Sequence, residues 1–263
     1  MLQKLIQPSP PLRQYILYYY MVETNHPNDF FPAQRVYPHG NIILVFHYRN
    51  PSLIRKPGEE SYTEPKTVIC GQQTSYYDLG LAGNTGMIFV VFAPFASGMF
   101  FNIPMHEIID KNIRFEDVIG KEADILEDKI QNADNISERI KIIDDFLVKS
   151  LSENYIYPGQ ILAAFDLIKQ SDGLTTVKRL GEIACLGKKQ FERKFASFVG
   201  MYPKSYLRIV RFQNLLTKKY QHDKLVSVAL ENGFYDQSHF IRDFKAFTGV
   251  TPGKFFSNKK GIE

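Results

Sequence analysis

Polar side chains that hydrogen-bond bases and phosphates are concentrated near the end of the chain. One face of a helix expected after Asp236 carries five of them: Gln237, Ser238, His239, Arg242 and Lys245. The other face carries apolar residues at i, i+1, i+4 and i+7: Phe240, Ile241, Phe244 and Phe247. A short amphipathic pattern at 225–232 and Gly233 come just before. Two short helices joined by a glycine-containing turn are typical of a helix-turn-helix.

A second unit of the same design lies 49 residues earlier. The helix expected at 188–198 has an apolar face made by Phe191, Phe195 and Phe198. Its other face is polar and mostly basic, with Lys188, Lys189, Gln190, Glu192, Arg193, Lys194 and Ser197. Arg193 and Arg242 occupy matching places, and both units end in Gly-x-x-Pro, at Gly200 and Gly249. Such similarity at a fixed offset indicates an internal repeat.

A helix expected at 203–220 joins the two units. At ~1.5 Å per residue it would span roughly 27 Å, close to the ~34 Å between successive major-groove faces on one side of B-DNA. Basic residues in and around the units could neutralise phosphates, which adds affinity but no sequence information. The candidate phosphate contacts are Lys188, Lys194, Lys204, Arg208, Lys218, Lys219 and Lys245, with Arg211 nearby.

Residues 175–255 resemble the DNA-binding domain of the AraC/XylS family of bacterial transcription regulators. The motifs are Ala184 and Gly187, Phe191-x-Arg193-x-Phe195, Gly200-x-x-Pro203, Val228-Ala229-x-x-x-Gly233-Phe234, Asp236-Gln-Ser-His-Phe-x-Arg-x-Phe-Lys245 and Gly249-Val-Thr-Pro252. The resemblance implies seven helices and two recognition helices in adjacent major grooves. It places Lys189, Gln190, Glu192 and Arg193 at one groove and Gln237, Ser238, His239 and Arg242 at the next. Glu192 departs from a plain basic helix and could accept from a cytosine amino group, or pair with a neighbouring lysine.

The first half of the chain is rich in strand signals. Strands are expected at 15–23, 41–48, 67–70, 75–79 and 87–93. The run 41–48 is apolar at odd and even positions, so both of its faces should be covered. We expect an α+β chain whose antiparallel N-terminal sheet closes into a cupin-like barrel, or forms a sandwich. A small ligand would bind in the mouth of such a barrel.

This half is also similar, more weakly, to a β-rich domain attached to AraC-type regulators. The similar stretches are 37–47, 71–74 and 92–94. In the family such domains sense effectors or mediate dimerisation, but no residue set here identifies an effector.

Helical patterns follow at 95–101, 104–110, 121–131 and 136–151, and Asn135 with Glu138 resembles a capping pair. Leu126, Ala133, Ile140 and Leu147 recur every seven residues. We favour helices packed on their own sheet over a dimer seam, because a break at 133–135 interrupts any coiled coil. A boundary near 150–160 predicts a β-rich domain with appended helices at 1–155 and a DNA-binding domain at 156–263.

Charge differs between the two halves. Residues 1–158 hold 14 Lys and Arg against 19 Asp and Glu, whereas residues 159–263 hold 18 against 9. Such asymmetry indicates that the basic half meets a polyanion. Two distant cysteines, Cys70 and Cys185, and the lack of a signal-peptide pattern predict a cytoplasmic protein. The uncharged run 79–106 is broken by glycines and prolines, so no membrane partner is expected.

Catalytic motifs are missing. The sequence has no nucleophile elbow and no phosphate-binding loop. His39 and His47 lack the partners of a metal site, so a structural role is favoured. We therefore expect a non-enzymatic regulator, without cofactor or metal, that binds double-stranded DNA. A small effector, a second copy of the chain and RNA polymerase are further candidate partners. The alternatives are an alkyl-repair enzyme fused to a similar DNA-binding half, which would need a reactive cysteine, and a DNA-binding protein without a ligand.

Overall fold

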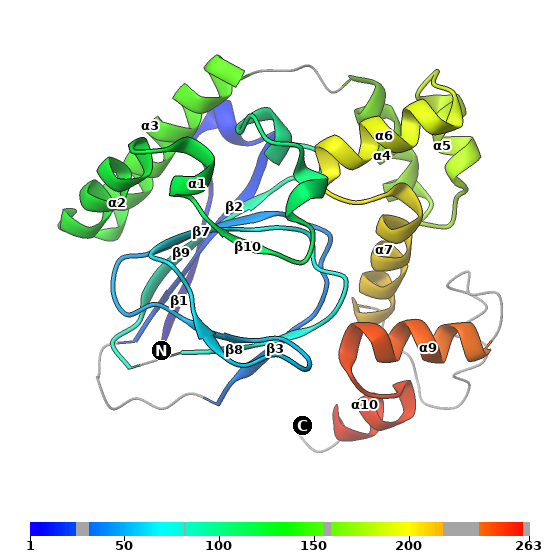
Figure 1. Ribbon diagram of the computed structural model, residues 1–263, viewed down its shortest axis with the longest axis horizontal. Coiled ribbons are helices and arrows are strands. Elements are labelled where there is room, and N and C mark those ends of the chain that lie inside the picture. Colours follow the sequence, from blue (N-terminus) through cyan, green and yellow to red (C-terminus); the bar gives the residue numbers. More distant parts are fainter. Residues whose placement is uncertain (25–31, 82, 155–158, 218–236, 260–263) are drawn as a thin grey trace.

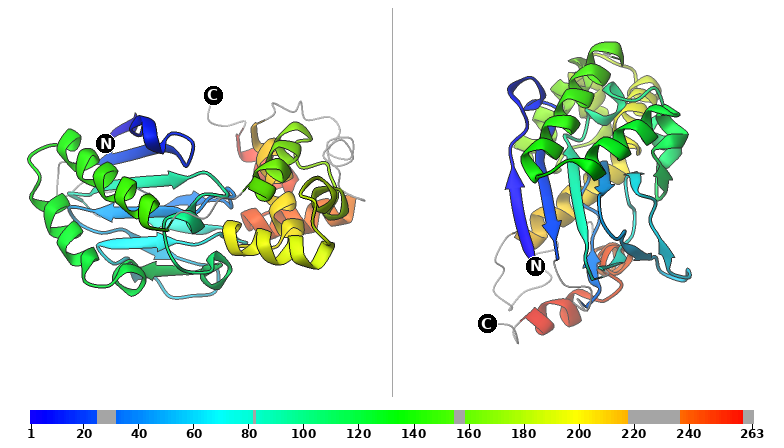
Figure 2. Two further views of the ribbon diagram at one scale, coloured as in Figure 1. Left: turned by 90° about the horizontal axis from the view of Figure 1, so that it is seen from above. Right: turned by 90° about the vertical axis from the view of Figure 1, so that its left-hand side faces the viewer.

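The chain folds into a strand-rich N-terminal part with its own helices and a helical C-terminal part (Figure 1). The computed structural model describes residues 1–24, 32–81, 83–154, 159–217 and 237–259. Viewed from above, the sheets lie on one side and the helices of the C-terminal part lie on the other (Figure 2). The arrangement is the α+β class predicted from the sequence.

The strands form two antiparallel sheets. The six-stranded sheet has, in order, β1 (Leu2–Ile6), β2 (Ile16–Glu23), β9 (Gly86–Phe92), β4 (Ile43–His47), β7 (Thr67–Cys70) and β10 (Asn112–Arg114). The four-stranded sheet has β3 (Gln34–Val36), β8 (Tyr77–Gly80), β5 (Leu53–Arg55) and β6 (Tyr62–Thr63). Antiparallel pairing was predicted correctly, but the closed barrel is wrong, because no strand pairing among the described residues joins the two sheets.

Strand β4 is covered on both of its faces. Leu44 and Phe46 point into a core that also contains helical residues such as Phe146. Val45 points to the other face, into a smaller cluster with Val68. Both faces of the six-stranded sheet are therefore covered, as the apolar pattern predicts, and layering alone buries them.

The helices of the N-terminal part cover one face of the six-stranded sheet. They are α1 (Glu116–Ile119), α2 (Glu122–Asn132) and α3 (Ile136–Asn154), preceded by 3₁₀ turns at Pro10–Leu12, Ser97–Met99 and Met105–Ile108. The two segments expected to be helical at 95–101 and 104–110 form only these last two turns. The heptad residues Leu126, Ile140 and Leu147 are buried within the chain, in line with helices packed on their own sheet.

The described C-terminal part contains six helices: α4 (Gly159–Gln170), α5 (Val177–Ile183), α6 (Lys188–Val199), α7 (Pro203–Thr217), α9 (Gln237–Thr248) and α10 (Pro252–Lys259). The helix predicted at 225–232 and the predicted end of α7 at 220 lie outside the described residues, as does the domain boundary at 155/156. No helix in the described ranges combines the length and the apolar character that crossing a membrane requires.

Candidate nucleic-acid interface

Helix α6 presents a polar face that is open to solvent. Phe191, Phe195 and Phe198 turn inward and are at most 6% exposed. The side chains of Lys188, Lys189, Gln190 and Arg193 are exposed, and Glu192 is half-buried. Lys194 donates from Nζ to the Gln160 side-chain oxygen at 2.7 Å, so this candidate phosphate contact is tied to α4.

The turn before α6 fixes how the helix leaves α5. The Thr176 hydroxyl caps α5 by accepting from the backbone N–H of Arg179 at 3.2 Å. Cys185 has a φ of 54°, and the backbone N–H of Leu186 donates to the Gly181 carbonyl at 2.9 Å. A Cβ at Gly181 would lie 3.1 Å from the Leu186 carbonyl oxygen, so the close turn favours glycine there.

Helix α9 repeats the arrangement of α6. Phe240, Phe244 and Phe247 are at most 3% exposed and face inward. The opposite face presents the exposed side chains of Gln237, Ser238, Arg242 and Lys245. His239 is half-buried, with Nε2 3.7 Å from the Asp243 carboxylate.

Helix α7 supports the inner faces of both helices. Tyr206 packs edge-on against Phe195 of α6, with ring centroids 5.6 Å apart. Phe212 packs against Phe244 and Phe247 of α9, at 5.6 and 5.0 Å. The exposed sides of α6 and α9 are therefore held by one shared aromatic core.

Arg208, a candidate phosphate contact, has a partner within the chain. Its guanidinium forms a bidentate ion pair with Asp243, at 2.8 and 2.6 Å, which joins α7 to α9. Asp243 is 3% exposed and was overlooked in the sequence. The sequence does contain a signal for this pair, because Asp243 lies three residues after Phe240 on the apolar face of α9. A carboxylate buried on that face requires a cationic partner.

The remaining candidate phosphate contacts differ in placement. Lys204 is exposed at the start of α7. Arg211, farther along α7, is half-buried, and burial lowers the pKa of its guanidinium. Lys218 and Lys219 lie outside the described residues.

The N-terminal histidines are held by structural contacts. His47 is buried, with Nε2 3.2 Å from the Ser52 hydroxyl and 3.4 Å from the Glu64 carboxylate. His39 precedes β4, and its Nδ1 accepts from the backbone N–H of Asn41 at 3.2 Å. Within the described residues, no three His, Cys, Asp or Glu side chains are arranged to hold a metal ion.

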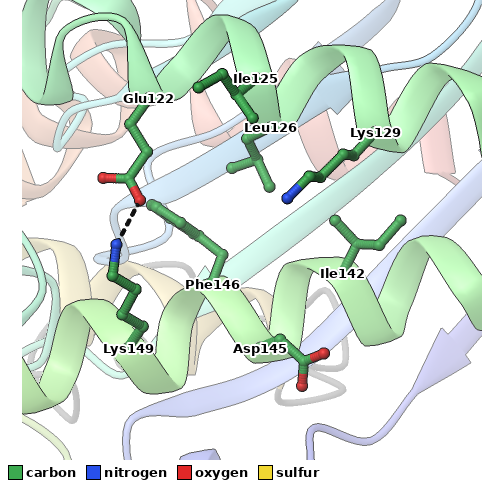
Figure 3. A pocket seen from close by; sticks show the side chains of 8 residues that line it. All are labelled: Glu122, Ile125, Leu126, Lys129, Ile142, Asp145, Phe146 and Lys149. Atoms are coloured by element: carbon green, nitrogen blue, oxygen red, sulfur yellow. Dashed lines mark hydrogen bonds and ion pairs between the residues drawn. The ribbon is translucent and has the colours of Figure 1, made fainter.

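The described surface contains two hollows of interest. One of about 310 Å³ lies between α2 and α3, where Leu126 and Phe146 sit beside the Glu122–Lys149 ion pair (Figure 3). The other, of about 440 Å³, is more polar and lies between N-terminal loops and α9. Its lining includes Lys56, Tyr76, Asp110 and Lys245.

Two family profiles match the chain. Residues 4–114 match a domain of unknown function, DUF6597. Residues 180–258 match a helix-turn-helix domain. The second match contains α6, α7 and α9, and therefore every candidate base contact.

Curated relatives are similar over a limited stretch. An uncharacterized HTH-type transcriptional regulator of Haemophilus influenzae is 25% identical over 116 residues, which cover 40% of this chain and 39% of that protein. Invasion protein InvF of Salmonella typhimurium is 33% identical over 104 residues, 39% of this chain and 45% of InvF. The HTH-type transcriptional regulator MtrA of Neisseria gonorrhoeae is 33% identical over 81 residues, 30% of this chain and 27% of MtrA. The match thus spans less than half of each relative.

Solved structures are similar over most of the chain but at low scores. ToxT from Vibrio cholerae has 11% identity and a TM-score of 0.44, covering 92% of this chain and 97% of that chain. The AraC-like transcriptional activator CuxR has 11% identity and a TM-score of 0.29, covering 82% and 87%. The chain thus carries a DUF6597 domain followed by a helix-turn-helix domain, and the curated relatives that it matches over part of their length include HTH-type transcriptional regulators.

Proposed function

We propose that this protein is a sequence-specific DNA-binding transcriptional regulator that inserts α6 and α9 into adjacent major grooves. In this proposal Lys189, Gln190, Glu192 and Arg193 read bases in one groove. Gln237, Ser238, His239 and Arg242 read bases in the next. Arginine and glutamine side chains recognise guanine and adenine edges through paired hydrogen bonds.

One observation carries the proposal. Two helices repeat the same division, with three phenylalanines buried and an arginine exposed at the matching position, Arg193 or Arg242. A solvated charged face would account for either helix alone. Both helices pack on α7, and this half of the chain holds 18 Lys and Arg against 9 Asp and Glu. The repetition therefore favours, as the ligand, a polyanion with a periodic groove.

Base readout is tested on an operator selected from random DNA by the purified chain. Arg193→Ala and Arg242→Ala should each relax preference at one base step and cost about 1–3 kcal/mol. Lys204→Ala should weaken binding evenly across sequences and reduce its salt dependence. If both arginine variants keep the wild-type base preferences, the groove assignment is wrong.

Two other functions make different predictions. An alkyl-repair enzyme needs a reactive thiolate, yet burial raises the pKa of the Cys70 thiol well above its usual value. A methyl-transfer assay tests that activity directly. A non-specific DNA-binding protein would protect no discrete site in footprinting, whereas a regulator would. A small effector, a homodimer and a contact with RNA polymerase stay predictions of the proposed regulator.

A further inference from the structure

Both recognition helices end at a glycine in the left-handed region. Gly200 ends α6 with a φ of +89°, and Gly249 follows α9 with a φ of +79°. Their backbone N–H groups close the last turns by donating to Ala196 and Lys245, at 2.9 and 2.8 Å. This is the usual helix stop, in which glycine avoids the steric cost of a positive φ. Here both stops also meet the N-terminal part.

The end of α6 is packed tightly against the N-terminal part. A Cβ at Gly200 would lie 3.1 Å from Gln72 Cγ, 3.1 Å from the Met105 carbonyl oxygen and 3.3 Å from Ile42 Cδ1. A Cβ at Gly98 would likewise lie 3.4 Å from the Phe198 Cα. Helix α6 therefore meets the N-terminal part through close backbone contact, with little room to slide.

The end of α9 is held by a different set of residues. A Cβ at Gly249 would lie 2.6 Å from the Tyr76 ring. The Arg35 guanidinium stacks 4.0 Å from the centroid of that ring and donates to the Thr248 carbonyl at 3.2 Å. Arg35 is itself paired with Asp78 of β8 at 2.9 Å. The last turn of α9 is thus attached to the four-stranded sheet.

The middle of α7 also contacts the N-terminal part, between the contacts made by the end of α6 and those made by the end of α9. A Cβ at Gly40 would lie 3.2 Å from the Tyr206 ring. The Gln213 side chain donates to the Pro38 carbonyl, and the Tyr37 ring meets Phe212 at 6.3 Å. Figure 1 shows α6, α7 and α9 following one another along the side of the N-terminal sheets.

We propose that the N-terminal part positions the two recognition helices and so sets which half-site spacing the protein accepts. The contacts responsible form a clamp surface, defined as Arg35, Ile42, Gln72, Tyr76 and Met105. This inference rests on the proposed function, because it assigns the clamp surface to DNA reading. The contacts lie at the helix ends, away from the candidate base-reading residues, so they act on helix placement and not on bases.

Half-site spacing provides the test. One inserted base pair moves the second half-site by ~3.4 Å and rotates it by roughly 35°. The wild-type chain should lose about tenfold or more in affinity, because a fixed pair of helices then fails to engage both half-sites together. Arg35→Gln and Tyr76→Ala should bind the native operator about three- to tenfold more weakly, because the helices are less preorganised. In both variants the inserted base pair should cost only about threefold or less, and affinity for a single half-site should be unchanged.

Arg55→Gln is the matched control. Arg55 also pairs with Asp78, at 3.1 Å, but among the described residues its side chain forms no hydrogen bond or ion pair with α9. Its loss therefore removes an ion pair from the same carboxylate without releasing the helix. This variant should keep the full wild-type penalty for the inserted base pair. If Arg35→Gln and Tyr76→Ala also keep that penalty, the clamp surface does not set the spacing and the proposal is overturned.

Hydrogen exchange on the DNA-free chain separates this inference from the proposed function. Both clamp variants should speed exchange of the Gly249 amide about fivefold or more, while the Gly200 amide stays as in the wild type. Unchanged exchange at Gly249 would overturn the clamp even if the protein binds a specific operator. If the wild type selects no operator, the proposed function fails, and the assignment of the clamp to DNA reading fails with it.

Discussion

Asp243 illustrates how one residue can fix the position of a helix, here α9. Its carboxylate is buried and receives two hydrogen bonds from Arg208, so α7 and α9 are joined at a defined register. The exposed faces of α6 and α9 were predictable from periodicity, because each polar residue there follows the spacing of the buried phenylalanines. The Arg208–Asp243 pair was not, because it depends on the packing of helices far apart in sequence. From the sequence alone, Arg208 is one of several basic residues near the helices, and it is therefore interpreted as a candidate phosphate contact.

Removal of this carboxylate should destabilise the protein measurably. Asp243→Ala leaves the Arg208 guanidinium without its two charge-assisted hydrogen bonds, and we expect the free energy of unfolding in urea to fall by about 1.5–3 kcal/mol. Glu182→Ala is the control, since it breaks the exposed Arg179–Glu182 pair at 3.2 Å. An exposed pair of this kind contributes about 0–1 kcal/mol. Equal losses for the two variants would contradict the structural role of Asp243.

His39 should make stability depend on pH. Burial lowers the pKa of its imidazole below the ordinary value, and Nδ1 accepts a backbone hydrogen bond that needs the unprotonated atom. The unfolded chain takes up this proton near pH 6.5. The contribution of neutral His39 is therefore fully present above about pH 6.5 and is lost as the pH falls toward the lowered pKa of the folded state.

The measurement compares urea unfolding at about pH 7.5 and about pH 5.5. His39→Gln should show a smaller loss of stability at the lower pH than the wild type. His106→Gln replaces an exposed histidine and should follow the wild type. If His39→Gln loses as much stability at the lower pH as the wild type does, the pH dependence comes from other groups.

At the scale of elements, the longer amphipathic helices and the buried strands were predictable, whereas short exposed strands were not. The bounds of α2 and α6 follow the 3.6-residue pattern to within about two residues, which is the usual uncertainty of helix ends. Strands β1, β3 and β5 were not predicted. They are short and largely exposed, so they lack the buried alternation that identifies a strand.

The capping pair predicted at the start of α3 can be tested by mutation. The Asn135 side chain accepts from the backbone N–H of Glu138 at 3.0 Å, and the Glu138 carboxylate accepts from the backbone N–H of Asp134 at 2.8 Å. Asn135→Ala should lower the free energy of unfolding by about 1 kcal/mol. Asn135→Asp keeps an acceptor at the cap and should preserve most of the stability. A loss of the same size in both variants would mean that the cap oxygen is not what stabilises α3.

At the scale of the whole molecule, the closed barrel was wrong because the sequence pattern does not reveal what covers a sheet. The alternating faces of β4 are consistent with a barrel wall or with a middle layer. Helix α3 decides between them, since its Phe146 ring meets Phe115 at 5.9 Å on the covered face of the six-stranded sheet. The same core continues into the C-terminal helices, and the rings of Phe95 and Phe165 meet at 5.7 Å. Such contacts between distant segments are not visible in either segment alone.

A continuous core predicts that the two parts unfold together. The larger hydrophobic cluster includes buried residues of both parts, from Leu12 to Phe255, so neither part can lose its packing without exposing the other. Far-UV and tyrosine near-UV circular dichroism should give coincident urea transitions, as a two-state unfolding reaction requires. Phe165→Ala removes ring contacts with Phe95, Phe195 and Tyr206. This variant should shift the single transition to a lower urea concentration and reduce the free energy of unfolding by about 2–4 kcal/mol. Two separate wild-type transitions would contradict a shared core.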